Sequence, residues 1–423
     1  MIVGGTVRVP GDKSITHRAL LFGALARGTS HVGGALTSLD ARSSARVLRQ
    51  LGADVSPLRA GSVLALGGRG RLRRPEGVLD CGNSGTTTRL LLGLLAGHRF
   101  PATLTGDGSL RRRPMRRVTV PLARMGARFT ELNGDGLPLA VRGGALTPLR
   151  YEMPVSSAQI KSALLLAGLA GGVEVELREP HGRSRDHTER LLRAFGYRVD
   201  EADGWIRFAP TGHVEPFDLQ VPGDPSSSAF LVGAAVLADG GELRIAGVGI
   251  NPTRTGFLGV LQRMGAPVVV EDVTEHFGEP VANLVVRPAG LRATEIAAGE
   301  IPGLIDEIPL LAVLAARAEG RTIFRQVGEL RVKESDRLGL IAENLRAVGG
   351  RAEVSGDDLH VEGVAAPPRG PVRSAGDHRL AMAFAVLGTV PGARIRVDDM
   401  ACAAVSFPRF TETLRGIARR SRS

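Results

Sequence analysis

Three lysines stand out in a chain that otherwise carries its positive charge on arginine. Of the 54 basic residues, only Lys13, Lys161 and Lys333 are lysine. Lysine supplies a compact, flexible ammonium and arginine a planar fork, so the two are not interchangeable where geometry matters. We therefore interpret the three lysines as candidates for functional positions, with chance survival in an arginine-biased sequence as the alternative.

Two acidic motifs carry the candidate proton-transfer groups. Asp306 and Glu307 lie in the apolar stretch GLIDEIPLL, where an unpaired carboxylate would be costly. A carboxylate here is either a general base or a helix cap. Glu334 follows Lys333 in the charged segment RVKESDR, for which a solvated helix with paired charges is the alternative interpretation.

The histidines and cysteines do not indicate a metal centre. His378 lies between an aspartate and an arginine in GDHR, where it could bind an anion, shuttle a proton or be structural. The nine histidines are scattered, and none pairs with another at the spacing of metal ligands. The two cysteines, Cys81 and Cys402, are far apart in the sequence. Their number and spacing therefore indicate neither a disulfide framework nor a thiolate metal site.

Six apolar segments must position these motifs. They are rich in Ala and Leu, recur at intervals of 66 to 81 residues, and begin at Ala19, Leu90, Ala163, Ala229, Leu310 and Ala381. Each follows a polar stretch of the kind found at helix N-caps, namely GDKSITHR, CGNSGTTTR, VSSAQIKS, PGDPSSS, GLIDEIP and AGDHR. Short helices that are apolar all round are usually buried, and their amino termini favour anions. The pattern predicts six buried helices whose amino termini form anion sites.

A second, amphipathic helix accompanies each apolar segment. Copies such as VLRQLGADV, PLARMGARF and LLRAFGYRV end in a glycine C-cap and lead into a strand. The chain therefore contains six α/β units. The tetrapeptide VPGD at Val9 recurs 212 residues later at Val221, which divides the units into two halves of three.

The composition agrees with a soluble enzyme that acts on anions. The chain has 423 residues, 43% apolar content and a formal net charge of +11, with dispersed basic residues apart from short clusters such as Arg111 to Arg117. Its apolar runs are shorter than the ~18 residues of a membrane span, and the amino terminus lacks a secretion pattern. We expect a cytoplasmic, two-lobed enzyme whose basic cleft binds small, multiply anionic substrates.

Nine motifs along the chain resemble those of one family. In chain order they are GDKSITHR, GNSGTTTR, SLRRRP, SSAQIKSALLLAGL, SRDHTE, GLIDEIP, RVKESDRL, GDHRLAM and SFP. This set resembles the enolpyruvyl transferases, and specifically the branch that uses shikimate 3-phosphate. The likeness extends from residue 3 to about residue 410, so it covers nearly the whole chain.

The resemblance implies a particular architecture. It is an α/β fold of two inside-out, barrel-like domains, each of three βαβαββ repeat units with buried helices, and the active site lies in the cleft between them. One lobe would span residues 12–223 and the other residues 1–11 and 224–423, with hinges near 9–12 and 221–224. The resemblance also implies a cytoplasmic monomer that needs no cofactor and no metal, and that binds neither nucleic acid nor membrane.

The implied reaction moves the enolpyruvyl group of phosphoenolpyruvate to the 5-hydroxyl of shikimate 3-phosphate, through a tetrahedral intermediate, with release of phosphate. The implied catalytic residues are Asp306 as base and Glu334 and Lys13 for the other proton transfers. Phosphoenolpyruvate would be contacted by Lys13, Asn83, Gly85, Arg113, Gln159, Arg337, His378 and Arg379. Shikimate 3-phosphate would be contacted by Lys13, Ser14, Arg18, Ser156, Ser157, Gln159, Arg185, Asp306 and Lys333. Glyphosate is expected to compete with phosphoenolpyruvate.

Two positions depart from the family pattern or stay without a role. Val405, in ACAAVSFP, stands where some members carry a further lysine that contacts phosphoenolpyruvate. Lys161 matches a lysine present in only part of the family, and the resemblance assigns it no catalytic function. It could cap or pair at its helix start.

Two alternative functions compete with this interpretation. A sister enolpyruvyl transferase acts on UDP-N-acetylglucosamine, but it usually carries a reactive cysteine in the loop that here spans Gly106 to Pro114, and asparagine where this chain has Ser14. An RNA-binding or RNA-processing protein is suggested by the net charge and the basic tail Arg419 to Arg422. The few aromatic residues on which bases could stack argue against it.

Overall fold

The computed structural model describes residues 1–180 and 182–419, which form two compact units. Unit 1 consists of Met1–Pro10, Pro222–Thr274 and the chain from Pro280 onward. Unit 2 consists of Gly11–Val221 and the short turn Glu275–Glu279. Most of the basic tail that suggested RNA binding, residues 420–422, lies outside the described residues.

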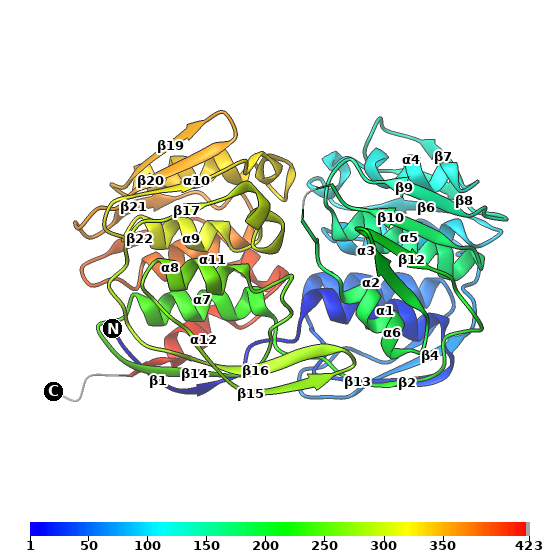
Figure 1. The fold of residues 1–423 in the computed structure, drawn as a ribbon, viewed down its shortest axis with the longest axis horizontal. Helices are drawn as coiled ribbons and strands as arrows, with labels where there is room; N and C mark the ends of the chain where they lie inside the picture. Colours follow the sequence, from blue (N-terminus) through cyan, green and yellow to red (C-terminus); the bar gives the residue numbers. More distant parts are fainter. Residues whose placement is uncertain (181, 420–423) are drawn as a thin grey trace. The chain divides into compact units, whose positions relative to one another are not determined.

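The six Ala- and Leu-rich segments form the predicted buried helices (Figure 1). In unit 2 they are α1 (Lys13–Leu25), α3 (Gly85–Ala96) and α5 (Ala158–Gly171). In unit 1 they are α7 (Pro225–Val236), α9 (Ile308–Ala315) and α11 (His378–Leu387). Four of them begin at a side-chain cap, provided by Asp12, Ser84, Asp224 and Asp377. Each cap satisfies a backbone N–H that the first helical turn leaves without a partner.

The amphipathic helices are also present. They are α2 (Leu39–Gln50), α4 (Arg116–Arg124), α6 (His187–Ala194), α8 (Gly256–Arg263), α10 (Arg337–Ala347) and α12 (Phe410–Gly416). Their apolar faces pack toward the two hydrophobic cores, one in each unit. Small residues bring the buried helices close together. At Gly93, for example, a Cβ atom would lie 2.0 Å from the carbonyl oxygen of Ala163, so α3 could not approach α5 this closely with a larger residue.

The described strands of unit 2 form three four-stranded sheets. Their strand orders are β13 (Asp218–Gln220), β2 (Arg27–Gly33), β4 (Leu64–Arg69), β3 (Asp54–Val55); β5 (Leu79–Asp80), β6 (Pro101–Thr105), β8 (Leu139–Arg142), β7 (Arg128–Glu131); and β11 (Val199–Ala202), β12 (Trp205–Phe208), β10 (Val175–Arg178), β9 (Leu149–Glu152).

Unit 1 has sheets of five, four and two strands in its described part. Their orders are β15 (Val269–His276), β16 (Glu279–Val286), β14 (Gly240–Gly249), β1 (Ile2–Val7), β23 (Ala418–Arg419); β17 (Glu295–Ile296), β18 (Arg321–Phe324), β20 (Asp358–Glu362), β19 (Arg351–Ser355); and β21 (Arg369–Val372), β22 (Arg394–Val397). The α/β class predicted from the sequence is confirmed, and across residues 1–180 and 182–419 the sheets stay separate rather than closing into a barrel.

One connection recurs among the sheets. Strands β5 and β6, β9 and β10, and β17 and β18 are parallel pairs joined through a buried helix, and an outer helix then leads to an antiparallel hairpin. Parallel strands need such a crossover, because a tight turn cannot join them. The polar motifs lie in the connections from strand to helix, which lead straight into α3 and α5 and pass through the 3-10 helix η2 (Ala298–Gly303) before α9.

The turn Glu275–Glu279 belongs to unit 2 although its flanking strands belong to unit 1. In unit 2 the ring of Phe277 packs against Phe195, and His187 Nδ1 lies 2.7 Å from Glu279 Oε1. The sequence patterns did not predict that this turn belongs to unit 2, whose other residues end at Val221.

Candidate active site

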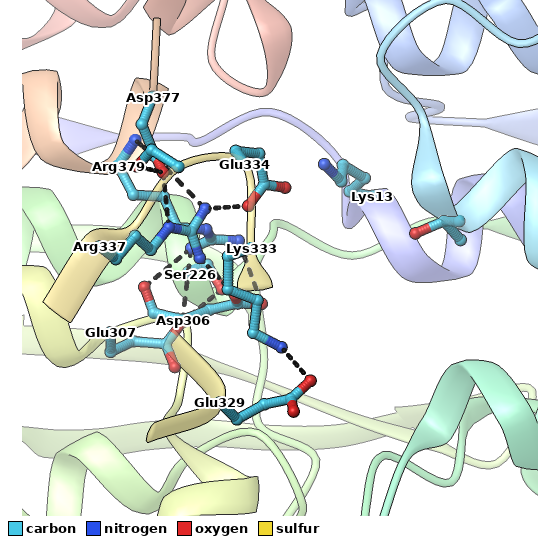
Figure 2. A network of polar contacts seen from close by, with 12 residues as sticks. Lys13, Ser226, Asp306, Glu307, Glu329, Lys333, Glu334, Arg337, Asp377 and Arg379 are labelled. Carbon is cyan, nitrogen blue, oxygen red and sulfur yellow. Dashed lines mark hydrogen bonds and ion pairs between the residues drawn. The ribbon is translucent and has the colours of Figure 1, made fainter. Parts of the chain in front are cut away.

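Arg337 lies at the centre of a buried charged cluster in unit 1 (Figure 2). It is the first residue of α10, and its side chain is inaccessible to solvent. Nε donates to Asp377 Oδ2 at 2.7 Å, Nη1 donates to Asp306 Oδ1 at 3.3 Å, and Nη2 donates to Glu334 Oε2. Burial by itself lowers the pKa of Arg337, but the three carboxylates raise it above its ordinary value, so the guanidinium remains charged.

Arg379 holds Asp306 from a second direction. Its Nη2 lies 3.2 Å from Asp306 Oδ2, and its Nη1 donates to the backbone oxygen of Asp306 at 3.1 Å. The Asp306 side chain remains 15% exposed, in contrast to the fully buried Arg337. Two guanidinium groups therefore fix the direction of a carboxylate that solvent, and hence a substrate, can still reach.

Lys333 lies between the 3-10 helix η3 (Gly328–Val332) and α10, with Nζ 3.6 Å from Glu329 Oε1. Burial lowers the pKa of Lys333 below its ordinary value, with Glu329 and Asp306 acting in the opposite direction. The alternative interpretation of RVKESDR as a solvated helix is wrong. The segment ends a 3-10 helix and begins α10 at a fully buried arginine.

A second buried polar group adjoins Asp306 and consists of Glu307, Ser226 and Arg254, of which only Glu307 was a candidate from the sequence. Glu307 is 1% exposed and accepts a hydrogen bond from Ser226 Oγ, in the first turn of α7. Arg254, which is 2% exposed, donates to the same hydroxyl at 2.9 Å. Glu307 occupies the N-cap position of α9 but makes no side-chain capping bond, so the helix-cap interpretation does not hold for this residue.

In unit 2, Lys13 is the first residue of α1 and forms an ion pair with Asp40 of α2. Nζ lies 2.7 Å from Asp40 Oδ2, and the lysine side chain is 19% exposed. Asp12 accepts from the backbone N–H of Ile15 at 2.8 Å and so caps the helix that carries Lys13. The ammonium group is thus held at a helix amino terminus and remains partly accessible.

Arg18, one turn further along α1, is buried and fixed by hydroxyl groups. Nε donates to Thr188 Oγ1 at 2.7 Å, and Nη2 donates to Ser162 Oγ at 2.6 Å. Nη1 donates to the backbone oxygen of Ser14 at 2.9 Å. Burial lowers the pKa of Arg18 to about 10, an effect that Glu189 opposes. At neutral pH the guanidinium is still charged.

Gly85 begins α3 beside Arg113. A Cβ atom at this glycine would lie 3.0 Å from Arg113 Nη1, which is tighter than ordinary van der Waals contact. Arg113 Nη2 donates to Asn83 Oδ1 at 3.0 Å, and Asn83 Nδ2 donates to Asp107 Oδ2 at 2.6 Å. The absence of a side chain at Gly85 therefore leaves room for this guanidinium.

Gln159, in the first turn of α5, bridges two residues of α3. Its Oε1 accepts from Arg89 Nη1 at 2.5 Å, and its Nε2 donates to Thr86 Oγ1 at 3.1 Å. Arg89 is a buried cation that the sequence motif GNSGTTTR contained but that was not assigned to the site. Its burial at a helix amino terminus distinguishes it from the exposed arginines of the surface.

The remaining predicted residues lie at or near the amino termini of α5, α6 and α11. Ser156 Oγ donates to the backbone oxygen of Gly182 at 3.0 Å, and Ser157 is the N-cap residue of α5. Arg185 is half-buried just before α6, and His378 is buried as the first residue of α11. The predicted site residues thus fall into two sets, one in each unit. Unit 1 gathers Asp306, Lys333, Glu334, Arg337, His378 and Arg379, and unit 2 contains Lys13, Ser14, Arg18, Asn83, Gly85, Arg113, Ser156, Ser157, Gln159 and Arg185.

Within residues 1–180 and 182–419, no group of three or more His, Cys, Asp or Glu side chains is arranged to hold a metal ion. In the same ranges no helix has the length and hydropathy to cross a membrane. The side chains of the two units offer cations, carboxylates and helix amino termini.

Comparison with known proteins gives a consistent result across nearly the whole chain. Residues 2–414 match the family model of EPSP synthase (3-phosphoshikimate 1-carboxyvinyltransferase). Proteins named 3-phosphoshikimate 1-carboxyvinyltransferase are 45% identical in Geobacter sp. strain M21, over 99% of this chain and 97% of the relative, and 49% identical in Paramagnetospirillum magneticum, over 98% of this chain and 95% of the relative.

Solved structures agree. The EPSP synthase of Acinetobacter baumannii is similar with a TM-score of 0.86 and 38% sequence identity, over 99% of this chain and 96% of that one. The enolpyruvyl transferase NikO from Streptomyces tendae has a TM-score of 0.78 at 22% identity, over 98% of this chain and 95% of that one. The second likeness concerns the fold alone.

Proposed function

The chain belongs to the EPSP synthase family, and from this premise we propose that it transfers the enolpyruvyl group of phosphoenolpyruvate to the 5-hydroxyl of shikimate 3-phosphate. The products are 5-enolpyruvylshikimate 3-phosphate and phosphate. The reaction belongs to the shikimate pathway, which leads to the aromatic amino acids. The protein is accordingly a transferase.

The observation that best supports the chemistry is the setting of Asp306. Its carboxylate lies between the guanidinium groups of Arg337 and Arg379 and remains partly accessible. Phosphoenolpyruvate carries a carboxylate and the phosphate that is released. Shikimate 3-phosphate carries a second carboxylate and a second phosphate. Guanidinium forks bind such groups by paired, charge-assisted hydrogen bonds. A base held beside two such forks is placed where anionic substrates are expected.

The proposed mechanism needs three proton movements. Asp306 accepts the proton of the 5-hydroxyl as that oxygen bonds to C2 of phosphoenolpyruvate, while Glu334 or Lys13 delivers a proton to C3. The product of this addition is a tetrahedral intermediate. The group that delivered the proton then takes one back from C3 as phosphate leaves C2, which restores the double bond. Positioned acids and bases of this kind typically contribute about 10²- to 10⁴-fold to a rate.

Phosphoenolpyruvate is assigned to cationic and polar residues of both units, namely Lys13, Asn83, Gly85, Arg113, Gln159, Arg337, His378 and Arg379. Shikimate 3-phosphate is assigned to Lys13, Ser14, Arg18, Ser156, Ser157, Gln159, Arg185, Asp306 and Lys333. Lys13 forms an ion pair with Asp40 in this structure. We propose that a substrate phosphate or carboxylate replaces Asp40 as its main partner, because three N–H donors allow an ammonium to serve more than one anion.

The finer architecture belongs to the same proposal. Each unit would be an inside-out, barrel-like domain of three βαβαββ repeats, the hinges would lie near residues 9–12 and 221–224, and the two residue sets would act on one pair of substrates. The protein would work as a cytoplasmic monomer without a cofactor. The recurring β–α–β connections around α3, α5 and α9 support the repeat.

Incubation of the purified protein with shikimate 3-phosphate and phosphoenolpyruvate tests the function directly. We expect release of one phosphate per enolpyruvyl product, with both quantified in the same reaction. No release under conditions where an established enzyme of the family works would overturn the proposal. A filter-binding assay tests the RNA-binding alternative, which predicts salt-sensitive RNA affinity.

A further inference from the structure

Lys161, the third lysine of the chain, is completely buried in the second turn of α5. Its Nζ lies 2.9 Å from Glu179 Oε2 and 2.8 Å from Glu189 Oε1, and it donates to the backbone oxygen of Ser184 at 3.1 Å. Burial by itself lowers the pKa of Lys161, but Glu189 and Glu179 together raise it above the ordinary value. The ammonium is therefore charged and meets three oxygen atoms.

Those three oxygen atoms belong to one segment. Glu179 follows β10, Glu189 lies in the first turn of α6, and Ser184 lies between them. Glu179 Oε2 also accepts from the backbone N–H of Ser184 at 3.1 Å. Lys161 thus contacts Glu179, Ser184 and Glu189, and Ser184 immediately precedes Arg185.

The same contacts extend to Arg18. Ser162, the next residue of α5, accepts from Arg18 Nη2 at 2.6 Å and from Thr188 Oγ1 at 2.7 Å. Glu189 acts on Arg18 as well as on Lys161, since it opposes the effect of burial on the Arg18 pKa. Glu189 is therefore common to both cations, while Glu179 pairs with Lys161, and residues of α1, α5 and α6 are joined at this point.

We propose that Lys161 is a positioning residue for shikimate 3-phosphate, which it never touches, because it sets the place of Arg18 and of the segment that carries Arg185. This inference rests on the function proposed above. A buried charged group is weak evidence for stability, because its desolvation offsets much of the attraction. We therefore assign the contacts of Lys161 with Glu179 and Glu189 to the orientation of Arg18 and Arg185 rather than to stability.

The geometry also explains why arginine has not replaced this lysine. An ammonium group is compact, and here it donates to Glu179 and to the backbone of Ser184 and forms an ion pair with Glu189 inside a closed space. A guanidinium is planar and larger, so it cannot reach all three acceptors from the same helix position. This requirement accounts for a lysine at position 161 in a chain whose other basic residues are almost all arginine.

The test uses a variant that keeps the buried charge balanced. Lys161→Met/Glu179→Gln removes one cation and one anion and leaves Glu189 to Arg18. We expect the dissociation constant of shikimate 3-phosphate, measured by calorimetry without phosphoenolpyruvate, to rise at least about tenfold, as expected for lost charge-assisted contacts. The KM for phosphoenolpyruvate should change less than about twofold.

A second variant and a matched control separate positioning from stability. Lys161→Arg keeps every charge, and it should weaken shikimate 3-phosphate binding in the same direction; it carries the test if the double variant does not fold. Leu139→Ala removes a buried side chain from β8 of the same unit, away from the charged cluster. It should lower the melting temperature without changing the dissociation constant.

The outcomes distinguish this inference from the proposed function. Wild-type protein that releases no phosphate from the two substrates overturns the function itself. Active wild-type protein, together with Lys161 variants that bind shikimate 3-phosphate normally, overturns only the positioning role. An equal loss of binding in Leu139→Ala would also overturn it, because general destabilisation would then suffice.

Discussion

Arg337 and Asp377 form an ion pair that solvent does not reach, with Nε and Oδ2 2.7 Å apart and both side chains fully buried. Asp377 accepts two further hydrogen bonds. One comes from the backbone N–H of Arg379 and caps α11, and the other comes from Ser335 Oγ at 3.0 Å. One carboxylate therefore sets the position of two arginines that we assign to phosphoenolpyruvate.

Asp377→Asn should impair the binding of phosphoenolpyruvate. The amide can still cap α11, but it leaves the buried Arg337 charge without its main partner, which costs about 3–5 kcal/mol in comparable pairs. We expect the KM for phosphoenolpyruvate to rise at least about tenfold, because Arg337 is no longer held toward the substrate. Steady-state kinetics with each substrate varied in turn measures this effect.

Asp336→Asn is the matched control for that experiment. Asp336 precedes Arg337 and caps α10 through Gly339, but it is exposed and outside the buried cluster. It should leave the KM for phosphoenolpyruvate nearly unchanged. Similar kinetics for the two variants would show that the Arg337–Asp377 pair has no special part in binding.

Asp306→Asn should reduce turnover more than binding. The amide keeps the shape of the side chain but cannot accept the proton of the hydroxyl. We expect kcat to fall by about 10²- to 10⁴-fold, the usual contribution of a general base. The dissociation constant of shikimate 3-phosphate should change only a few-fold, since most of its proposed contacts remain. A kcat within threefold of the wild-type value, as measured by phosphate release, would remove Asp306 from the role of base.

Gly85→Ala should push Arg113 away from its present position. The added methyl group would lie 3.0 Å from Arg113 Nη1, so the guanidinium must move by a few tenths of an ångström. We expect a several-fold higher KM for phosphoenolpyruvate with little change in the KM for shikimate 3-phosphate. Gly108→Ala serves as control, because its Cβ atom would lie 3.7 Å from Arg112 in ordinary contact. Equal effects of the two substitutions would contradict the explanation.

Glyphosate should inhibit competitively with respect to phosphoenolpyruvate. The basis is the family resemblance together with the small residue at position 85, which leaves space beside Arg113. Initial rates at several phosphoenolpyruvate concentrations, each with and without glyphosate, should show inhibition relieved by excess phosphoenolpyruvate. An inhibition constant indifferent to the phosphoenolpyruvate concentration would refute this prediction.

His17 should make the folded protein less stable in acid. Burial, reinforced by Lys13 and Arg18, lowers its pKa from 6.5 to about 3. Between these pH values the unfolded chain binds one proton more than the folded chain. The contribution of His17 is therefore complete above pH 6.5 and decreases by about 1.4 kcal/mol per unit as the pH falls.

Urea unfolding at pH 7, 6, 5 and 4 measures this slope for the wild type and for His17→Gln. The variant loses the titrating ring, although its amide can still reach Ser44, which lies 2.7 Å from His17 Nδ1. We expect a shallower decrease of the unfolding free energy with acid in the variant. Parallel slopes for the two proteins would mean that His17 is protonated in the folded state as readily as in the unfolded state.

The sequence predicted the helices well because their signals are local. An apolar segment behind a capping residue specifies a buried helix almost independently of the rest of the chain, and Asp12, Ser84, Asp224 and Asp377 all make the expected bonds. The scarcity of lysine also directed attention to Lys13, Lys161 and Lys333, each of which has a carboxylate within 4 Å.

The partners of these groups could not be predicted in the same way. Asp40 lies 27 residues from Lys13, and Arg254 lies 28 residues from Ser226. In the sequence, Asp40 is an ordinary acidic residue of an amphipathic helix and Arg254 an ordinary residue of a turn. Their pairing depends on how strands and helices of one unit pack, which no local pattern expresses.

The position of β1 has a consequence for synthesis on the ribosome. This strand, Ile2–Val7, pairs on one side with β14 and on the other with β23 at residues 418–419. Strand β1 leaves the ribosome before β14 and β23, so its sheet is complete only after residues 418–419 have been made. Residues 11–221 form nearly all of unit 2 and are available long before then. Nearly all of unit 2 is therefore made while β1 still lacks both of its neighbouring strands.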